Sequence, residues 1–222
     1  MDRRAVGVGA RVSRRVSWGV VNTTPATGVP RPEDLDTLSL QLGRPVRDVV
    51  EIPARCRCGS PLVAATAPRL SNGIPFPTTF YLTHPTLTSA VSRLEAAGAM
   101  AEMSQRLLED AALADAYAAA HNNYVTERER IRELAGLEPV DEIAGISAGG
   151  MPERVKCLHV LAGHALAVGP TINPLGDETL DRISEDWTPQ MCTCETAWDH
   201  AAQVPTKDLS RHVRRLRDKE AS

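Results

Sequence analysis

Two cysteines stand one residue apart in the segment Arg55-Cys56-Arg57-Cys58-Gly59. Thiolates are preferred ligands of zinc, and a glycine allows a turn to tighten around an ion. The arginines on either side stabilise negative charge on the two thiols, which suits either metal binding or a reactive thiol. Zinc sites more commonly have two or more residues between paired cysteines, so this spacing also fits two incidental residues at a turn.

A third cysteine and two histidines lie on a helix that we expect over residues 155–168. Cys157 and His164 are seven positions apart and therefore share one face of a regular helix. At about 100° per residue, His159 is turned about 200° away from Cys157. These two converge only if the helix begins late, and a single cysteine on an apolar helix face is also a common core residue.

Two further groups have the side chains for metal binding. His84 precedes Pro85 at the junction of an expected strand and an expected helix, where rigid elements hold a ligand in place or where His84 merely begins the helix. Cys192 and Cys194 repeat the Cys-x-Cys spacing near the C-terminus. They lie beyond the expected core, which favours a mobile thiol pair over a metal site.

The elements that must position these groups fall into two halves. A helix is expected from Pro32, where proline and acidic residues occupy the first turn, to Gly43. Three strands are expected over residues 47–52, 62–66 and 78–83, with Pro53 ending the first and an Asn-Gly turn before the third.

The remainder has the periodicity of helices. Helices are expected from Pro85, around Met100 to Leu107, and over residues 111–134, 155–168 and 177–183, with a glycine-rich linker at 145–150. The sequence therefore predicts an α+β fold in which a small antiparallel sheet of about three strands packs against a helical C-terminal half. We expect a flexible basic extension at 1–31, a single domain at 32–186 and a flexible tail at 187–222.

Composition narrows the class of protein. The chain has 222 residues, of which 42% are hydrophobic, a balance that excludes wholesale disorder. No apolar run reaches the roughly 18–20 residues that a membrane span needs. The formal charge is -3, made of +4 over residues 1–30, +3 over 206–222 and therefore -10 between them. An acidic core is not expected to bind nucleic acid.

The N-terminus has no continuous apolar stretch of a secretory signal, which favours the cytoplasm. Thiols stay reduced there, and five cysteines, an odd number, fit poorly with a disulfide framework. The sequence contains no phosphate loop, no nucleophile elbow and no HExxH zinc motif. It therefore indicates no particular class of reaction.

Seven short segments follow one another along the chain: RCRCGSP at 55–61, APRL at 67–70, GIPFPT at 73–78, YLTHP at 81–85, SRLE at 92–95, MPERVKCLH at 151–159 and NPLGD at 173–177. As an ordered set they resemble one family, the mostly actinobacterial domain-of-unknown-function family 501, and the likeness covers residues 33–183. The resemblance implies no established activity. Its members are often encoded beside a septum-formation protein and an exopolyphosphatase-like protein.

The resemblance adds weight to a metal site. In the family pattern cysteine is common where His84 stands here, an exchange that a zinc ligand tolerates and a packing position does not. We therefore expect Zn²⁺ bound by Cys56, Cys58, His84 and Cys157, with His159 and His164 in reserve. Because four protein ligands close a zinc site, its role would be structural or regulatory.

Two other hypotheses remain open at this stage. The first is a thiol-dependent enzyme in which Cys157 or Cys56 is the nucleophile, His159 the base and Arg69 the group that holds an anion. The second is a metal-free interaction module in cell division or envelope control. Whether the protein is an enzyme is thus left open, and the sequence identifies no protein partner and no oligomeric state.

Overall fold

The computed structural model describes residues 28–206, so the charged stretches 1–27 and 207–222 lie outside the described residues. The described elements are α1 (Pro32–Leu42), β1 (Val49–Arg55), β2 (Pro61–Thr66), β3 (Phe80–Leu82), α2 (Pro85–Ala96), α3 (Ala99–Glu109), α4 (Ala111–Leu134), the 3-10 turn η1 (Asp141–Ile143), α5 (Leu158–Val168), α6 (Pro174–Arg182) and α7 (Cys194–Ala197). This order of elements confirms the α+β class.

The sheet has three antiparallel strands in the order β1-β2-β3. The expectation that Pro53 ends the first strand was wrong, because β1 continues to Arg55. Proline is tolerated here because β1 lies at the edge of the sheet and its pairing with β2 is interrupted by register shifts. The central strand, β2, is buried at every position.

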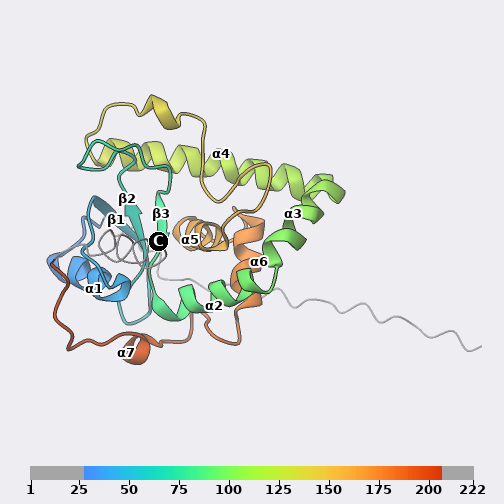
Figure 1. Cartoon of the computed structure of the whole chain (residues 1–222). Coiled ribbons are helices and arrows are strands. Elements are labelled where there is room, and N and C mark those ends of the chain that lie inside the picture. The colour runs from blue at the N-terminus through green and yellow to red at the C-terminus, as the bar shows by residue number, and fades with distance from the viewer. Residues whose placement is uncertain (1–27, 207–222) are drawn as a thin grey trace, which may run out of the picture.

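The apolar helix α5 lies at the centre of the molecule (Figure 1). It is flanked by β3 and by α2, α4 and α6, while α1 lies beyond the other side of the sheet. Two glycines make this packing close. A side chain at Gly163 would come within 3.0 Å of the Phe80 carbonyl, and one at Gly176 of α6 within 2.4 Å of the Leu161 carbonyl. Here, backbone packs on backbone.

Helix α5 begins at Leu158 rather than at residue 155 as expected. The preceding backbone is used elsewhere, because the amides of Arg154 and Lys156 donate to the carbonyls of Gly150 and Gly149. The amide of Leu158 donates instead to the Glu95 carboxylate of α2, at 2.7 Å. A tertiary contact thus fixes the start of this helix. The helix begins late, which is the condition under which Cys157 and His159 were expected to converge.

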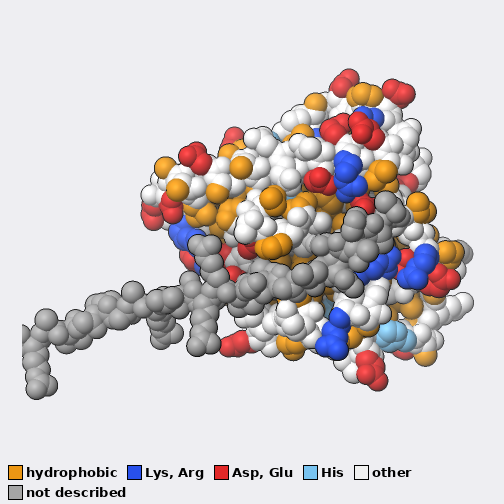
Figure 2. Space-filling view, turned by 180° about the vertical axis from the view of Figure 1, so that it is seen from behind, with side chains coloured by type: hydrophobic (Ala, Val, Ile, Leu, Met, Phe, Trp, Pro, Cys, Tyr) orange, Lys and Arg blue, Asp and Glu red, His pale blue; other side chains and the backbone are white. Residues whose placement is uncertain are grey.

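Packing continues beyond residue 186, where we expected the tail to begin. Trp187 is 1% exposed and Cys194 4% exposed, so both belong to the core. From α6 the chain passes below α2 to α7 and then toward α1 (Figure 1). In the described part of the chain, no helix is long and apolar enough to cross a membrane. Acidic and basic side chains are interspersed over the face seen in Figure 2.

Candidate metal centre

Four of the five cysteines meet at one end of the sheet. Cys56 and Cys58 lie in the turn between β1 and β2, whereas Cys192 and Cys194 lie in the C-terminal segment and at the start of α7. Their four Sγ atoms all lie within 4.8 Å of one another, so the group could hold a metal ion. All four are free thiols.

The turn that presents the first pair is tight. The Gly59 amide donates to the Cys56 carbonyl at 2.7 Å, and the Cys56 amide donates to the Ser60 carbonyl at 2.8 Å. Gly59 has φ of 92°, a conformation that only glycine adopts readily. Cys58 donates its thiol to the Ser60 hydroxyl at 3.4 Å. The glycine therefore allows two thiols to emerge on the same side of the turn.

The second pair is held against this turn by hydrogen bonds from both sides. Arg57 of the turn donates to the Gln190 carbonyl at 3.0 Å. Thr193 donates to the hydroxyl of Thr86 on α2, also at 3.0 Å, and a ring nitrogen of His200 lies 2.8 Å from the Cys194 carbonyl. These contacts fix the C-terminal segment on the sheet and on α2.

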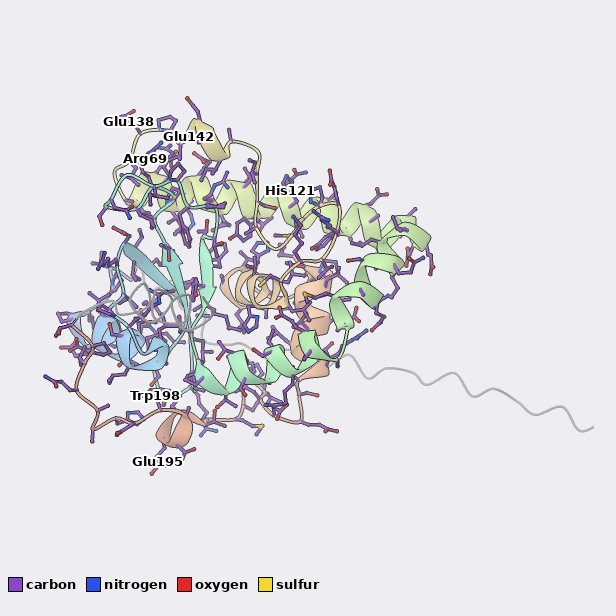
Figure 3. All side chains as sticks on the ribbon, in the orientation of Figure 1. Arg69, His121, Glu138, Glu142, Glu195 and Trp198 are labelled. Atoms are coloured by element: carbon purple, nitrogen blue, oxygen red, sulfur yellow. The ribbon has the colours of Figure 1, made fainter. Side chains whose placement is uncertain are left out.

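His84 lies beside the four cysteines and touches one of them. Its Nε2 is 3.4 Å from the Sγ of Cys194, and its ring stands edge-on to Trp198, which Figure 3 shows next to α7. Burial lowers the pKa of His84 to about 4, so its ring is neutral at pH 7. Within residues 28–206 its Nδ1 has no hydrogen-bond partner.

The thiols differ in how easily they ionise. Burial would raise the pKa of Cys58, but hydrogen bonding of its thiolate with Ser60, Cys194 and Cys192 outweighs burial and lowers that pKa to about 6. Burial raises the pKa of the Cys56 and Cys194 thiols. One thiol of the group is therefore ready to ionise near neutral pH, while the buried ones need a cation to do so.

Arg55 does not act on the thiols as the sequence suggested. It makes two hydrogen bonds with the Asp34 carboxylate of α1, at 2.7 and 2.9 Å, and this hydrogen-bonded pair holds the pKa of Asp34 well below its usual range. Arg55 also donates to the Gly59 carbonyl at 3.0 Å. Its role is to attach the turn to α1.

Cys157 belongs to a different group, together with Glu95 and His159. The Sγ of Cys157, a ring nitrogen of His159 and a carboxylate oxygen of Glu95 all lie within 4.8 Å of one another. Cys157 is the residue immediately before α5, so Cys157 and His159 converge as the late helix start allows. Both line a cavity of about 480 Å³ beside β3. The ligand set expected from the sequence is thus divided between two places.

The two remaining candidates lie elsewhere. His164 is buried, with its Nε2 2.8 Å from the Asn123 amide oxygen and its Nδ1 3.2 Å from the Asn173 amide nitrogen. Burial lowers its pKa to about 4, and both ring nitrogens have partners. Arg69 forms an ion pair with Glu142 at 2.7 Å near the end of α4, far from α7 (Figure 3).

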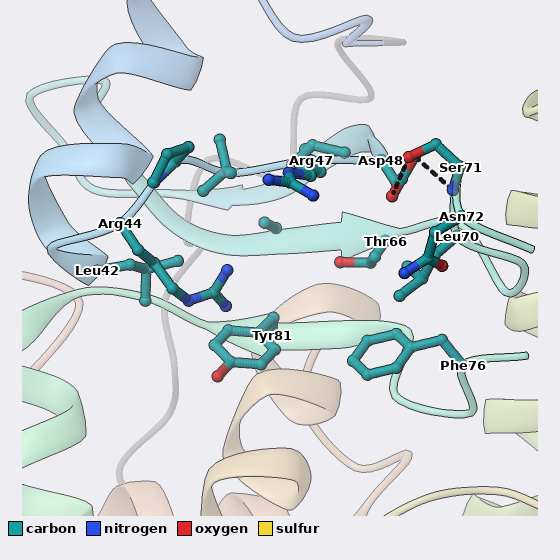
Figure 4. A pocket seen from close by; sticks show the side chains of 14 residues that line it. Leu42, Arg44, Arg47, Asp48, Thr66, Leu70, Ser71, Asn72, Phe76 and Tyr81 are labelled. Carbon is teal, nitrogen blue, oxygen red and sulfur yellow. Dashed lines mark hydrogen bonds between the residues drawn. The ribbon is translucent and has the colours of Figure 1, made fainter. Parts of the chain in front are cut away.

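A second cavity, of about 550 Å³, lies over the outer part of the sheet (Figure 4). Arg44 and Arg47 line it. The guanidinium carbon of Arg44 lies 5.8 Å from the centre of the Tyr81 ring. At its other end Asp48 accepts hydrogen bonds from the amide and hydroxyl of Ser71. Within residues 28–206, no cysteine or histidine lines this cavity, so it is separate from both thiol groups.

Sequence reasoning missed three of the residues in these groups. Cys192 and Cys194 were placed in a mobile tail, although their spacing repeats that of Cys56 and Cys58. That repetition was the available signal. Glu95 had no local signal of its own, because its role depends on α2 meeting the start of α5.

Comparisons with known proteins identify a family and nothing more specific. The family model described as "Protein of unknown function (DUF501)" matches residues 52–181, more than half of the chain. Glu95, Cys157, His159 and the first cysteine pair lie inside the matched residues, and Cys192 and Cys194 lie beyond them. Neither the comparison with curated proteins nor that with solved structures found a match.

Proposed function

Because the chain belongs to the DUF501 family of proteins of unknown function, whose description assigns no activity, we propose a role from the site itself: Cys56, Cys58, Cys192 and Cys194 bind one structural Zn²⁺. The observation that carries this proposal is the convergence of four Sγ atoms within 4.8 Å. Four sulfurs around a tetrahedral zinc, with bonds of about 2.3 Å, stand about 3.8 Å apart, so little movement is needed to bind one.

The donor atoms favour zinc and a structural role. A set of four thiolates suits soft metals and is a common structural zinc set. Four protein ligands leave no position for a water molecule or a substrate, which a catalytic zinc requires. A reducing compartment keeps such thiols free for metal, in agreement with the cytoplasmic location that we expect.

The surroundings of the cysteines support the same role. With Cys194 bound to zinc as a thiolate, the neutral ring of His84 would donate its Nε2 hydrogen to the Sγ of Cys194, and donors of this kind orient a ligand and strengthen metal binding. Arg57 brings a positive charge to the turn that would carry two of the four thiolates. Zinc would supply the cation that the buried thiols of Cys56 and Cys194 need in order to ionise.

The ion would join segments that are far apart in the chain. The first cysteine pair belongs to the β1–β2 turn, and the second lies after the last long helix. Binding would therefore fix residues 187–206 against the sheet and against α2. Because metal binding of this kind is coupled to folding, the role is to stabilise the fold and to set the position of the C-terminal segment.

Metal analysis of purified, tag-free protein tests the proposal. We expect about one zinc per chain, with the metal lost progressively as pH falls, because protons compete with zinc for the thiolates. Cys194→Ser should lose the metal, since a hydroxyl is a poor zinc ligand. Cys157→Ser is the matched control and should retain it, because Cys157 lies in the other group.

Two outcomes would contradict this assignment. A protein that contains no zinc and whose melting temperature does not respond to added zinc would have no such site. Loss of zinc in Cys157→Ser, with zinc retained in Cys194→Ser, would restore the ligand set expected from the sequence.

A further inference from the structure

Cys157 lies at the start of the central helix α5, where it lines a cavity. It occupies the N-cap position of α5, an 11-residue helix, and is partly exposed. The positive end of a helix dipole stabilises a thiolate. Cys157 also lines the cavity of about 480 Å³, a volume within the roughly 300–1,000 Å³ of small-molecule sites.

His159 places a positive charge beside this thiol. Its Nδ1 is 3.1 Å from the Glu95 carboxylate, and its Nε2 is 3.1 Å from the carbonyl of Thr88. The Nε2 atom also lies 3.3 Å from the hydroxyl of Ser92. The pKa of His159 is raised to about 9 despite its burial. The largest cause is the hydrogen bond with Cys157, followed by the charge and the hydrogen bond of Glu95 and by the hydrogen bond with the Thr88 carbonyl.

This arrangement favours thiol chemistry over a second metal site. A histidine binds a metal through the lone pair of a neutral ring, whereas a pKa of about 9 leaves His159 protonated at pH 7, and both of its nitrogens already have hydrogen-bond partners. Glu95 is engaged as well, because the same oxygen that faces His159 accepts the amide of Leu158 at 2.7 Å. The carboxylate therefore holds the imidazolium in place.

The cavity indicates what could reach the thiol. Among the described residues its lining is mainly apolar, supplemented by hydroxyl groups, one amide, the thiol and the imidazole, and contains no carboxylate: Gln41, Leu42, Thr78, Phe80, Tyr81, Leu82, Thr83, Thr88, Cys157, His159 and Val160. The amide oxygen of Gln41 is buried and has no hydrogen-bond partner in the described part of the chain, while its nitrogen donates to the Pro61 carbonyl. A ligand with an apolar group matches the greater part of this lining.

We propose that Cys157 is the nucleophile of an acyl-transfer site whose substrates are small esters or thioesters with an apolar acyl group. The Sγ thiolate forms a bond to the carbonyl carbon, and the bond from that carbon to the leaving oxygen or sulfur breaks. The leaving group takes the proton that His159 carried. Water then cleaves the new S–C bond, which returns the thiol and releases a carboxylic acid, so no oxidant or reductant is needed.

An acylation experiment on the full chain, kept in zinc-containing buffer, tests this site. p-Nitrophenyl acetate should give a burst of about one nitrophenolate per chain, with the acetyl group located on Cys157 by peptide mass spectrometry. Cys157→Ser should fold, because serine is a preferred N-cap residue, and should show no burst. Absence of a burst in the unmodified protein, or acetyl groups only on other residues, would overturn the proposal.

The contribution of His159 is tested by alkylation of Cys157 with iodoacetamide. In His159→Gln the rate at pH 7 should fall several-fold, because the variant lacks the positive charge that faces the attacking sulfur. The pH dependence of the rate should also differ from that of the unmodified chain, because the charge of His159, whose pKa is about 9, no longer contributes to it. The titratable groups that face the thiol in this cluster are Glu95 from α2 and His159 from α5.

His121→Gln is the matched control, since His121 is a partly buried histidine of α4 that pairs with Ser147. An equal rate and an equal pH profile in His159→Gln and the unmodified chain would overturn the assigned role of the cation. Zinc content measured on the same samples separates this result from the four-cysteine site. A second zinc per chain that disappears in Cys157→Ser would show that the group binds metal, and would overturn the acyl-transfer proposal.

Discussion

At the scale of single residues, two buried histidines with the same low pKa serve different purposes. His84 and His164 are each fully buried, and burial lowers each pKa to about 4. His164 has an amide partner on each ring nitrogen, supplied by Asn123 and Asn173. In the part of the chain that the structure describes, His84 has one hydrogen-bond partner, the Sγ of Cys194. The partners, and not the burial, distinguish a packing histidine from one that serves the cysteine group.

We expect His84→Ala to weaken zinc binding by about 10–100-fold, the usual effect of losing a hydrogen bond to a metal ligand. Competition with a chromophoric chelator measures this affinity. His164→Ala is the control, since it also removes a buried ring, and should lower the melting temperature while leaving the affinity for zinc unchanged. Equal zinc affinity in both variants would show that His84 has no part in the site.

The candidate ligands could be identified from the sequence by type but not by grouping. The segment around Cys56 and Cys58 was correctly placed at a turn between two strands. Its partners could not be inferred, because no periodic pattern shows that the chain returns from α6 to this turn. The return depends on isolated contacts, such as that of Arg57 with the Gln190 carbonyl, which leave no trace in local sequence.

At the scale of elements, α6 packs closely against α5 at Gly176. A methyl group at Gly176 would meet the Leu161 carbonyl at 2.4 Å and the Ala165 side chain at 2.8 Å. Neither atom can move easily, because one is backbone and the other lies on the same buried helix. The glycine therefore determines how near the first turn of α6 approaches α5.

Gly176→Ala should destabilise the protein by about 1–3 kcal/mol, the usual cost of overpacking a core. Helix propensity alone predicts the opposite sign, since alanine is favoured over glycine within a helix by about 1 kcal/mol. Urea denaturation followed by circular dichroism measures the change. The zinc content of the variant should be unaffected, and a gain in stability would show that α6 can move away from α5.

Most of the ends that are encoded locally were predicted well, although α6 begins at Pro174, three residues earlier than expected, where Asn173 caps it. The ends that depend on tertiary contacts were not predicted. Helix α1 begins at Pro32 and is followed by Gly43 as expected, and α4 has the expected bounds of residues 111 and 134. The strand containing Pro53 extends further than expected because it lies at a sheet edge. Helix α5 starts late because Glu95 from α2 binds its first amide.

At the scale of the whole molecule, the C-terminal segment closes the fold. Trp187 is buried in the main core together with Cys194, so the packed structure extends past the residues that match the family model. Between these two residues the chain has no regular helix or strand, and its position depends on side-chain contacts and, in our proposal, on the metal. Zinc binding and the folding of this segment should therefore be a single event.

Two shortened chains test that coupling. A chain that ends at residue 187 lacks Cys192 and Cys194, whereas a chain that ends at residue 206 keeps all four cysteines. With free zinc at about a thousand times the dissociation constant, binding stabilises the fold by about 4 kcal/mol. For a chain of this size that corresponds to about 10 °C in melting temperature.

We expect the chain ending at 206 to bind zinc, and a chelator to lower its melting temperature by about that amount. The chain ending at 187 should bind no zinc, melt at a lower temperature and show no response to the chelator, because Cys56 and Cys58 alone cannot close a site. Differential scanning calorimetry with and without the chelator measures all four states. Equal responses of the two chains to the chelator would show that the stabilising metal is bound without Cys192 and Cys194, and that the C-terminal segment packs on the sheet through its side chains alone.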